Sequence, residues 1–241
     1  MKTIFLLFGF LSVLTGTAQE ITNIVLVGPE GITDKIEKAQ SFIVVKQFPD
    51  YYERSDYKKG GPCVKIRCYK DSNLTVLHGN YYEYRADGTT FRSGKYKDNK
   101  KHERWVTLND TGKVISHLKY DNDVLIETVD LEKKDSVTKY DDEKESDFPG
   151  GQKAWSKYLL KSLEKKDGTS KAAKGGTVIV SFIVGLNGEV MDPHIYKSVE
   201  FFLDEDALEI VRKSPKWNPG WQNGHVVKSY KLQPIRFDIP E

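Results

Sequence analysis

One short apolar run constrains the fold of this chain more than any other feature. Six of the eight residues from Thr177 to Val184 are apolar. A strand that is apolar on both faces must be covered on both faces, which favours a central place in a sheet. Asn187-Gly188 follows, and an Asn-Gly pair between two strand patterns predicts a tight antiparallel turn. The sequence therefore predicts a hairpin whose first strand is central.

The two strands expected beside this central strand each contain a proline. Pro193 lies in the return strand, from Glu189 to Val199, and Pro234 lies in the last strand, from Val226 to about Ile239. Proline cannot donate a hydrogen bond to a strand ladder, so both strands are expected at sheet edges. A three-stranded sheet with the strand order 2-1-3 follows.

Two segments have the pattern of helices that could cover one face of this sheet. Residues 152–165 have apolar side chains at helical spacing, and residues 203–213 begin with acids and end with bases, which suits the helix dipole. Asp204 is the expected N-cap of the second helix. We therefore predict an α+β protein with a C-terminal two-layer domain, containing a three-stranded antiparallel-type sheet and two helices.

The N-terminal half contains a 24-residue internal repeat at about residues 78–125. Residues 84–88 recur as residues 108–112, and Lys95-Tyr96 recurs as Lys119-Tyr120. Each unit has the pattern of strand, tight turn, strand and polar turn, which predicts an array of β-hairpins. We expect residues 19–130 to form an all-β repeat meander. The glycines and tyrosines of residues 79–84 and 94–96 resemble MORN-type repeats, which implies a scaffold or a binding surface.

The chain begins with the pattern of a targeting segment. Lys2 precedes an apolar run from Ile4 to Leu14, and small residues follow at Gly16-Thr17-Ala18. This pattern predicts a signal peptide at residues 1–18 and export to the periplasm. The alternative is an uncleaved signal anchor in the inner membrane, with the rest of the chain facing the periplasm. Residues 131–147 include 11 charged residues and predict a linker, which leaves residues 148–241 for the C-terminal domain.

The remaining residues give little support to catalysis or to metal binding. The 37 basic and 35 acidic residues nearly balance, which gives no support to a nucleic-acid partner. The five histidines lack ligand spacing: His78, His102, His117, His194 and His225. We expect no enzyme activity, no cofactor, no metal and no small-molecule substrate. The odd separation of Cys63 and Cys68 predicts side chains on opposite faces of one strand, although a bend would allow a disulfide.

Several motifs of the last ninety residues occur in the order of a known family. They are Phe148-Pro149-Gly150-Gly151, residues 180–184 with Asn187-Gly188, residues 203–208, residues 215–220, residues 222–224 and residues 232–237. Together they resemble the TonB C-terminal domain, in the version found in Bacteroidetes-type energy transducers. The resemblance implies a periplasmic domain that binds outer-membrane TonB-dependent transporters by pairing a peptide with its last strand. Unlike a complete transducer, this chain has no Pro-rich spacer before residue 149.

The proline-free part of the last strand is the predicted partner-binding site. It consists of Val226, Val227, Lys228, Ser229, Tyr230, Lys231 and Leu232. An edge strand has unpaired backbone groups that a peptide strand can bind. The predicted function is partner binding by β-strand addition, with a role in energy-coupled transport. The alternative is a cell-envelope scaffold or binding protein in which the TonB-like domain forms a homodimer.

Overall fold

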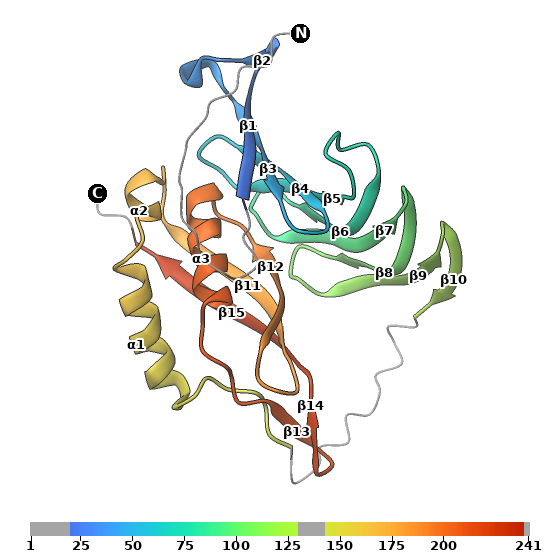
Figure 1. Ribbon diagram of the computed structural model, residues 1–241, viewed down its shortest axis with the longest axis vertical. Coiled ribbons are helices and arrows are strands. Elements are labelled where there is room, and N and C mark those ends of the chain that lie inside the picture. The colour runs from blue at the N-terminus through green and yellow to red at the C-terminus, as the bar shows by residue number, and fades with distance from the viewer. Residues whose placement is uncertain (1–19, 130–142, 239–241) are drawn as a thin grey trace. The chain divides into compact units, whose positions relative to one another are not determined.

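The chain forms two compact units. A computed structural model describes residues 20–129 and 143–238 (Figure 1). Residues 1–133 form the first unit and residues 134–241 the second. The predicted signal peptide and most of the predicted linker lie outside the described residues.

The first unit is a ten-stranded antiparallel sheet, which confirms the predicted N-terminal meander. Eight of its ten strands, β3 to β10, lie side by side in chain order, and β1 lies between β3 and β2. The strands are β1 (Glu20–Gly28), β2 (Gly31–Thr33), β3 (Ser41–Gln47), β4 (Tyr52–Lys58), β5 (Cys63–Tyr69), β6 (Leu77–Tyr84), β7 (Thr90–Lys97), β8 (Lys100–Leu108), β9 (Val114–Asp121) and β10 (Val124–Thr128). A 3-10 turn, Ile36–Lys38, connects β2 with β3.

The 24-residue repeat of the sequence is also a repeat of hydrogen bonds from backbone amides to turn side chains. The Leu77 amide donates to Asn99 Oδ1, and 24 residues later the Lys101 amide donates to Asp123 Oδ1, both at 2.7 Å. Asn99 and Asp123 both have left-handed backbone angles, with φ of 68° and 71°. Such angles belong to the tight two-residue turns that match the twist of a hairpin. The MORN resemblance itself remains a prediction.

Aromatic side chains of neighbouring hairpins stack on the meander, around Trp105. Its ring centroid lies 5.4 Å from that of Tyr81 and 5.0 Å from that of Tyr96, and the side chain is 4% exposed. A Cβ atom on Gly94 would lie 2.3 Å from the Trp105 ring. Glycine at this position therefore creates the space that the ring fills.

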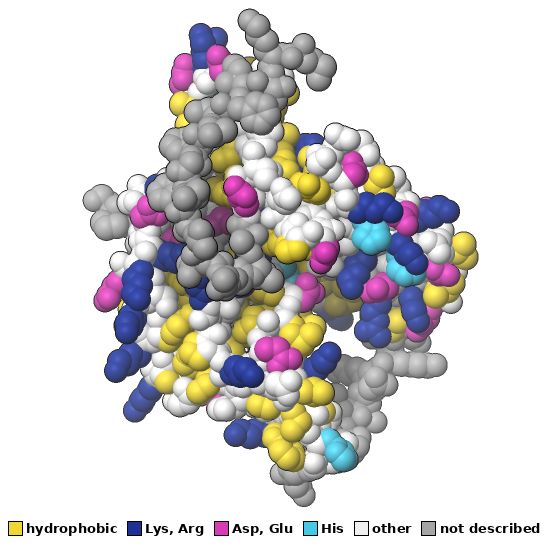
Figure 2. All heavy atoms as spheres, in the orientation of Figure 1, with side chains coloured by type: hydrophobic (Ala, Val, Ile, Leu, Met, Phe, Trp, Pro, Cys, Tyr) yellow, Lys and Arg dark blue, Asp and Glu magenta, His cyan; other side chains and the backbone are white. Residues whose placement is uncertain are grey.

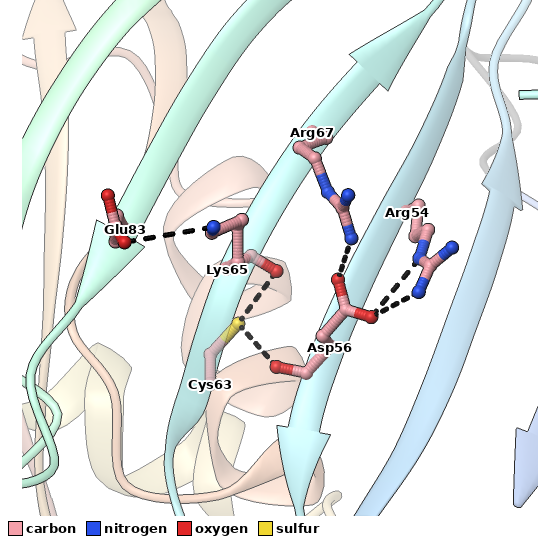
Figure 3. A network of polar contacts seen from close by, with 6 residues as sticks. All are labelled: Arg54, Asp56, Cys63, Lys65, Arg67 and Glu83. Atoms are coloured by element: carbon pink, nitrogen blue, oxygen red, sulfur yellow. Dashed lines mark hydrogen bonds and ion pairs between the residues drawn. The ribbon is translucent and has the colours of Figure 1, made fainter. Parts of the chain in front are cut away.

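In the polar network on β4, β5 and β6, each carboxylate is paired with at least one basic side chain (Figure 3). Asp56 accepts hydrogen bonds from both Arg54 and Arg67, and Lys65 lies 3.7 Å from Glu83. Because its charges pair with one another, this network stabilises the sheet and leaves little charge for a ligand.

Both cysteines are buried, neither forms a disulfide with a described residue, and they lie on one face of β5. Cys63 pairs with Tyr57 and Cys68 with Glu53, on either side of a register shift. The prediction of opposite faces is therefore wrong, because the shift places one extra residue in β5. The two partner positions on β4 are four residues apart, about 13 Å along a strand, which is too far for a disulfide.

The second unit confirms the predicted two-layer α+β domain. Its main sheet has the order β12-β11-β15, with β11 central and antiparallel to both neighbours. The elements are α1 (Gly151–Leu163), α2 (Gly168–Lys171), β11 (Gly176–Val184), β12 (Val190–Lys197), α3 (Phe201–Arg212), β13 (Gly220–Gln222), β14 (His225–Val227) and β15 (Ser229–Phe237). Pro193 and Pro234 lie in the two edge strands, as predicted.

Alternate residues of β11 form the centre of this domain's core. Val178, Val180, Phe182 and Val184 have no exposed surface, and neither do Leu203, Ala207 and Val211 of α3. Helix α3 begins two residues earlier than predicted, so Asp204 is not its N-cap. The Asp204 carboxylate is fully buried and instead accepts hydrogen bonds from the Val199 amide and the Ser198 hydroxyl, which belong to the chain before the helix.

Candidate functional site

The predicted partner-binding segment belongs to two strands rather than to one. Val226 and Val227 lie in β14, which pairs with β13, while Ser229 to Leu232 lie in β15, which pairs with β11. Lys228 connects the two strands. The prediction of one strand from Val226 to Ile239 is therefore wrong, because β11 ends at Val184 and a second partner strand takes over.

The hairpin between β11 and β12 determines which backbone groups of β15 are already bonded. Its turn closes with the hydrogen bond from the Gly185 amide to the Glu189 carbonyl, at 2.9 Å. The amide and carbonyl groups of Val184 therefore point toward β15, where Val184 pairs with Ser229. Bonded and non-bonded pairs alternate along an antiparallel ladder. Odd-numbered residues of β15 thus bond to β11, and even-numbered residues present their amides and carbonyls on the other side.

Pro234 gives independent support for this alternation. It pairs with Ile179 and has no N–H group to donate, so the pair must be a non-bonded one. Tyr230 and Leu232 have the same parity as Pro234. Their backbone N–H and C=O groups therefore point away from β11, and among the described residues no strand pairs with that side of β15.

The hairpin of β13 and β14 extends the same alternation. Its two-residue turn, Asn223-Gly224, has φ angles of 53° and 72°, so the flanking pair of Gln222 and His225 is a bonded one. Val226 then points its backbone groups away from β13. Val226, Tyr230 and Leu232 therefore all turn their backbone groups away from their partner strands, and we call the edge that these groups form the free edge.

The side chains at the free edge are mostly apolar and exposed. Tyr230 is 59% exposed, Leu232 44% and Val226 36%. Desolvation raises the pKa of the Tyr230 hydroxyl, and the neighbouring Ser181 acts in the opposite direction. Lys231 lies 3.4 Å from Glu145, so this residue is already paired within the unit.

The chain itself covers the opposite side of the small hairpin. Lys144 exchanges two backbone hydrogen bonds with Trp221, at 2.8 and 3.0 Å, and Asp147 exchanges two with Asn218, at 2.9 and 3.2 Å. These bonds bring the end of the predicted linker into the C-terminal unit. Sequence reasoning missed this pairing, because the charged segment lacks any strand pattern.

An aromatic cluster around Trp217 anchors the segment that leads into the free edge. Trp217 is 5% exposed, and its ring lies 5.1 Å from that of Phe182 and 5.4 Å from those of Trp155 and Phe148. The Trp217 amide donates to the Gly188 carbonyl at 2.8 Å. Trp217 is therefore a core residue that fixes the chain next to the edge, whereas Trp221 is 44% exposed.

Two buried carboxylates lie elsewhere in this unit, next to α2. Burial raises the pKa of Glu200, whose oxygens accept hydrogen bonds from the Ala173 amide. Burial also raises the pKa of Asp206, which accepts a hydrogen bond from the Gly168 amide, and Lys166 opposes this shift. Both groups bind backbone amides and hold the α2 segment against α3, which is a structural role.

A metal or membrane-spanning role has no support in residues 20–129 and 143–238. Within these ranges, no group of three or more His, Cys, Asp or Glu side chains could hold a metal ion. Nor does any helix in these ranges have the length and apolar character that crossing a membrane requires. His194 is half-buried on β12, and His225 is exposed on β14.

The fold of the second unit is of the α+β class, and its three-stranded sheet ends at the free edge. In the comparison with protein families, residues 169–239 match the family described as Gram-negative bacterial TonB protein C-terminal. No curated protein and no solved structure matches the chain. The family match begins after α1 and covers both halves of the free edge. A TonB C-terminal domain implies a location in the envelope or periplasm.

Proposed function

We propose that this chain is a periplasmic TonB-like protein that captures an extended segment of an outer-membrane transporter on its free edge. The observation that carries the proposal is the alternation along β14 and β15. It leaves the backbone groups of Val226, Tyr230 and Leu232 without a partner strand among the described residues. An added peptide strand would bond to these groups.

The side chains at the same positions support selectivity for an apolar partner. The side chains of Tyr230, Leu232 and Pro234 alternate with inward-facing ones along β15 and are exposed. A peptide strand places alternate side chains on this same sheet face, beside Tyr230 and Leu232. We expect the partner segment to carry β-branched or aromatic residues at alternate positions.

A proline at Leu232 tests the proposal. Leu232→Pro removes one outward N–H group and leaves the β11 ladder intact, as Pro234 already does. A net hydrogen bond contributes about 1 kcal/mol, so affinity should fall roughly five-fold or more, because the ring also obstructs the edge. The measurement is calorimetric titration of residues 19–241 with synthetic peptides copied from plug segments of the transporters of the same genome.

Two control variants separate the backbone from the side chain and from the fold. Leu232→Ala keeps the outward amide and should weaken binding less than Leu232→Pro. Lys231→Pro removes a bond to β11 and should destabilise the domain. Equal affinities for the wild-type chain and Leu232→Pro would contradict strand addition at this edge.

The second candidate function uses the same edge for a homodimer in an envelope scaffold. The exposed apolar side chains of the edge favour it, because a second copy could bury them. Sedimentation equilibrium distinguishes the two functions. A dimer that Leu232→Pro dissociates, together with no binding of any plug peptide, would replace transporter capture by dimerisation.

A further inference from the structure

The outer face of α1 has a regular charge pattern that the free edge does not use. Lys153, Lys157 and Lys161 lie four residues apart within α1, and Lys165 continues the series just past its end. All four lysines are exposed. Figure 2 shows a row of basic side chains along the outer side of α1. Residues four apart share one helix face at steps of about 6 Å, so these side chains form a lysine ridge about 18 Å long.

The lysine ridge has no structural role within the C-terminal unit. Neighbouring lysines are paired: Lys166 lies 2.5 Å from Glu209, Lys171 lies 2.6 Å from Asp167, and Lys213 lies 2.7 Å from Glu209. In contrast, none of the four ridge lysines forms an ion pair with a described residue. Like charges at this spacing destabilise a helix, so the ridge costs stability rather than adding to it.

The near-neutral total charge of the chain conceals this local excess. Residues 151–174 contain seven lysines and two acids, a net charge of +5, whereas the whole chain has +2. The rest of the chain therefore has a net charge of −3. The charge balance that argued against an anionic partner holds for the whole chain but not for α1 and the segment after it.

We propose that the lysine ridge docks the C-terminal unit on an anionic phospholipid surface. Lysine ammonium groups attract lipid phosphates without requiring fixed geometry, and each contributes to binding near such a surface. Leu160 is 65% exposed on the ridge beside the lysines, where its side chain can enter the lipid interface. The free edge is on β14 and β15, so this surface is separate from the proposed peptide site.

The composition of the exposed face favours lipid over nucleic acid or an acidic peptide. Those partners are recognised by planar guanidinium groups and by stacking aromatic side chains. The exposed face of α1 has neither. The helix contains no arginine, Trp155 is 2% exposed, and the Tyr158 hydroxyl turns inward and donates to the Ile210 carbonyl. A row of point charges along one helix face fits an extended anionic surface better than a folded anion.

Vesicle co-sedimentation tests the proposal. The protein is residues 19–241, without the apolar N-terminal segment that would itself enter bilayers. The vesicles are phosphatidylcholine alone or phosphatidylcholine with 30% phosphatidylglycerol, as a probe composition of about a third anionic lipid. We expect binding only to the anionic vesicles and a steep loss as salt increases, because salt screens exposed charges.

A charge-matched pair of variants locates the binding surface. Replacing the four ridge lysines by glutamine should weaken binding several hundred-fold, since each lysine near an anionic surface contributes about five-fold. The control replaces four exposed lysines of the first unit by glutamine and should weaken binding about three-fold or less, since isolated exposed charges are screened by salt. These control positions are Lys35, Lys38, Lys97 and Lys113.

Three results would overturn the proposal. The first is no binding of the wild-type chain to anionic vesicles at low salt. The second is an equal loss in both quadruple variants, which would assign binding to net charge. The third is binding to heparin with no binding to vesicles, which would indicate a soluble polyanion as the partner. Circular dichroism of both variants checks that the fold is retained, and plug-peptide affinity should be unchanged in both.

Discussion

The two units bury their sheets in different ways. In the C-terminal unit, four alternate residues of β11 have no exposed surface and face a helix with three more such residues. In the described part of the meander, only Val44 and Cys63 reach that state among the apolar side chains. The meander depends on turns and on stacked side chains such as Trp105 over Gly94, and these ring contacts join strands at most two places apart in the sheet.

This difference indicates where each unit is sensitive to substitution. In a unit with a single close-packed core, removing one large side chain lowers the free energy of unfolding of the whole unit. A repeat array instead sums local contributions between neighbours. We therefore expect the largest effects of single substitutions in the C-terminal unit and smaller, local effects in the meander.

The largest expected effect is that of Phe182→Ala. This residue is fully buried and contacts Trp217, so its truncation should lower the free energy of unfolding of the C-terminal unit by about 3–5 kcal/mol. Calorimetry should show a lower melting temperature for the C-terminal unit and an unchanged melting temperature for the meander. Leu186→Ala, at a position that is 50% exposed, is the control and should have little effect. A joint shift of both transitions would contradict the separation of the units.

A smaller effect is expected for Trp105→Ala in the meander. The ring contacts Tyr81 and Tyr96, but one face of a single sheet leaves room for water and for relaxation of neighbours. We expect a loss of about 2–3 kcal/mol in the meander transition alone, below the usual cost in a closed core. Trp221→Ala serves as the matched control and should leave the melting temperature of the meander unchanged. A loss for Trp105→Ala as large as that for Phe182→Ala would refute the contrast between the two units.

The smallest effect is a pH dependence confined to the C-terminal unit. Burial raises the pKa of Asp206 in the folded state, so the folded unit binds more protons than the unfolded chain. The resulting stabilisation is complete below the ordinary aspartate pKa of about 4 and is lost as pH rises through the folded-state value. Asp206→Asn should therefore reduce the fall in melting temperature between pH 4 and pH 7. The control Asp34→Asn, at an exposed position of the meander, should leave that fall unchanged, and a steeper fall in Asp206→Asn would refute the assignment.

The sequence alone predicted the sheet of the C-terminal unit, because its signals are local and strong. The apolar run of β11 and the two prolines were enough to give the strand order. The repeat likewise predicted the meander, since each hairpin depends on its own turn residues.

The free edge could be located from the sequence but not resolved into bonded and outward residues. That distinction depends on the register between β15 and β11, which the turn at Gly185 and Glu189 determines. The break at Lys228 also depends on where a non-adjacent strand ends. The strand-like pairing of Lys144 with Trp221 could not be predicted either, because only its partner has a strand pattern.

That pairing has a mechanical consequence. Lys144 and Asp147 are bonded to the segment that holds Asn218 and Trp221, directly beside β14. Tension applied to the chain at Glu143 would thus reach the hairpin next to the free edge across four backbone hydrogen bonds, before it loads α1 or α3. A pull from the N-terminal side and a pull from a captured peptide would meet in the same few strands.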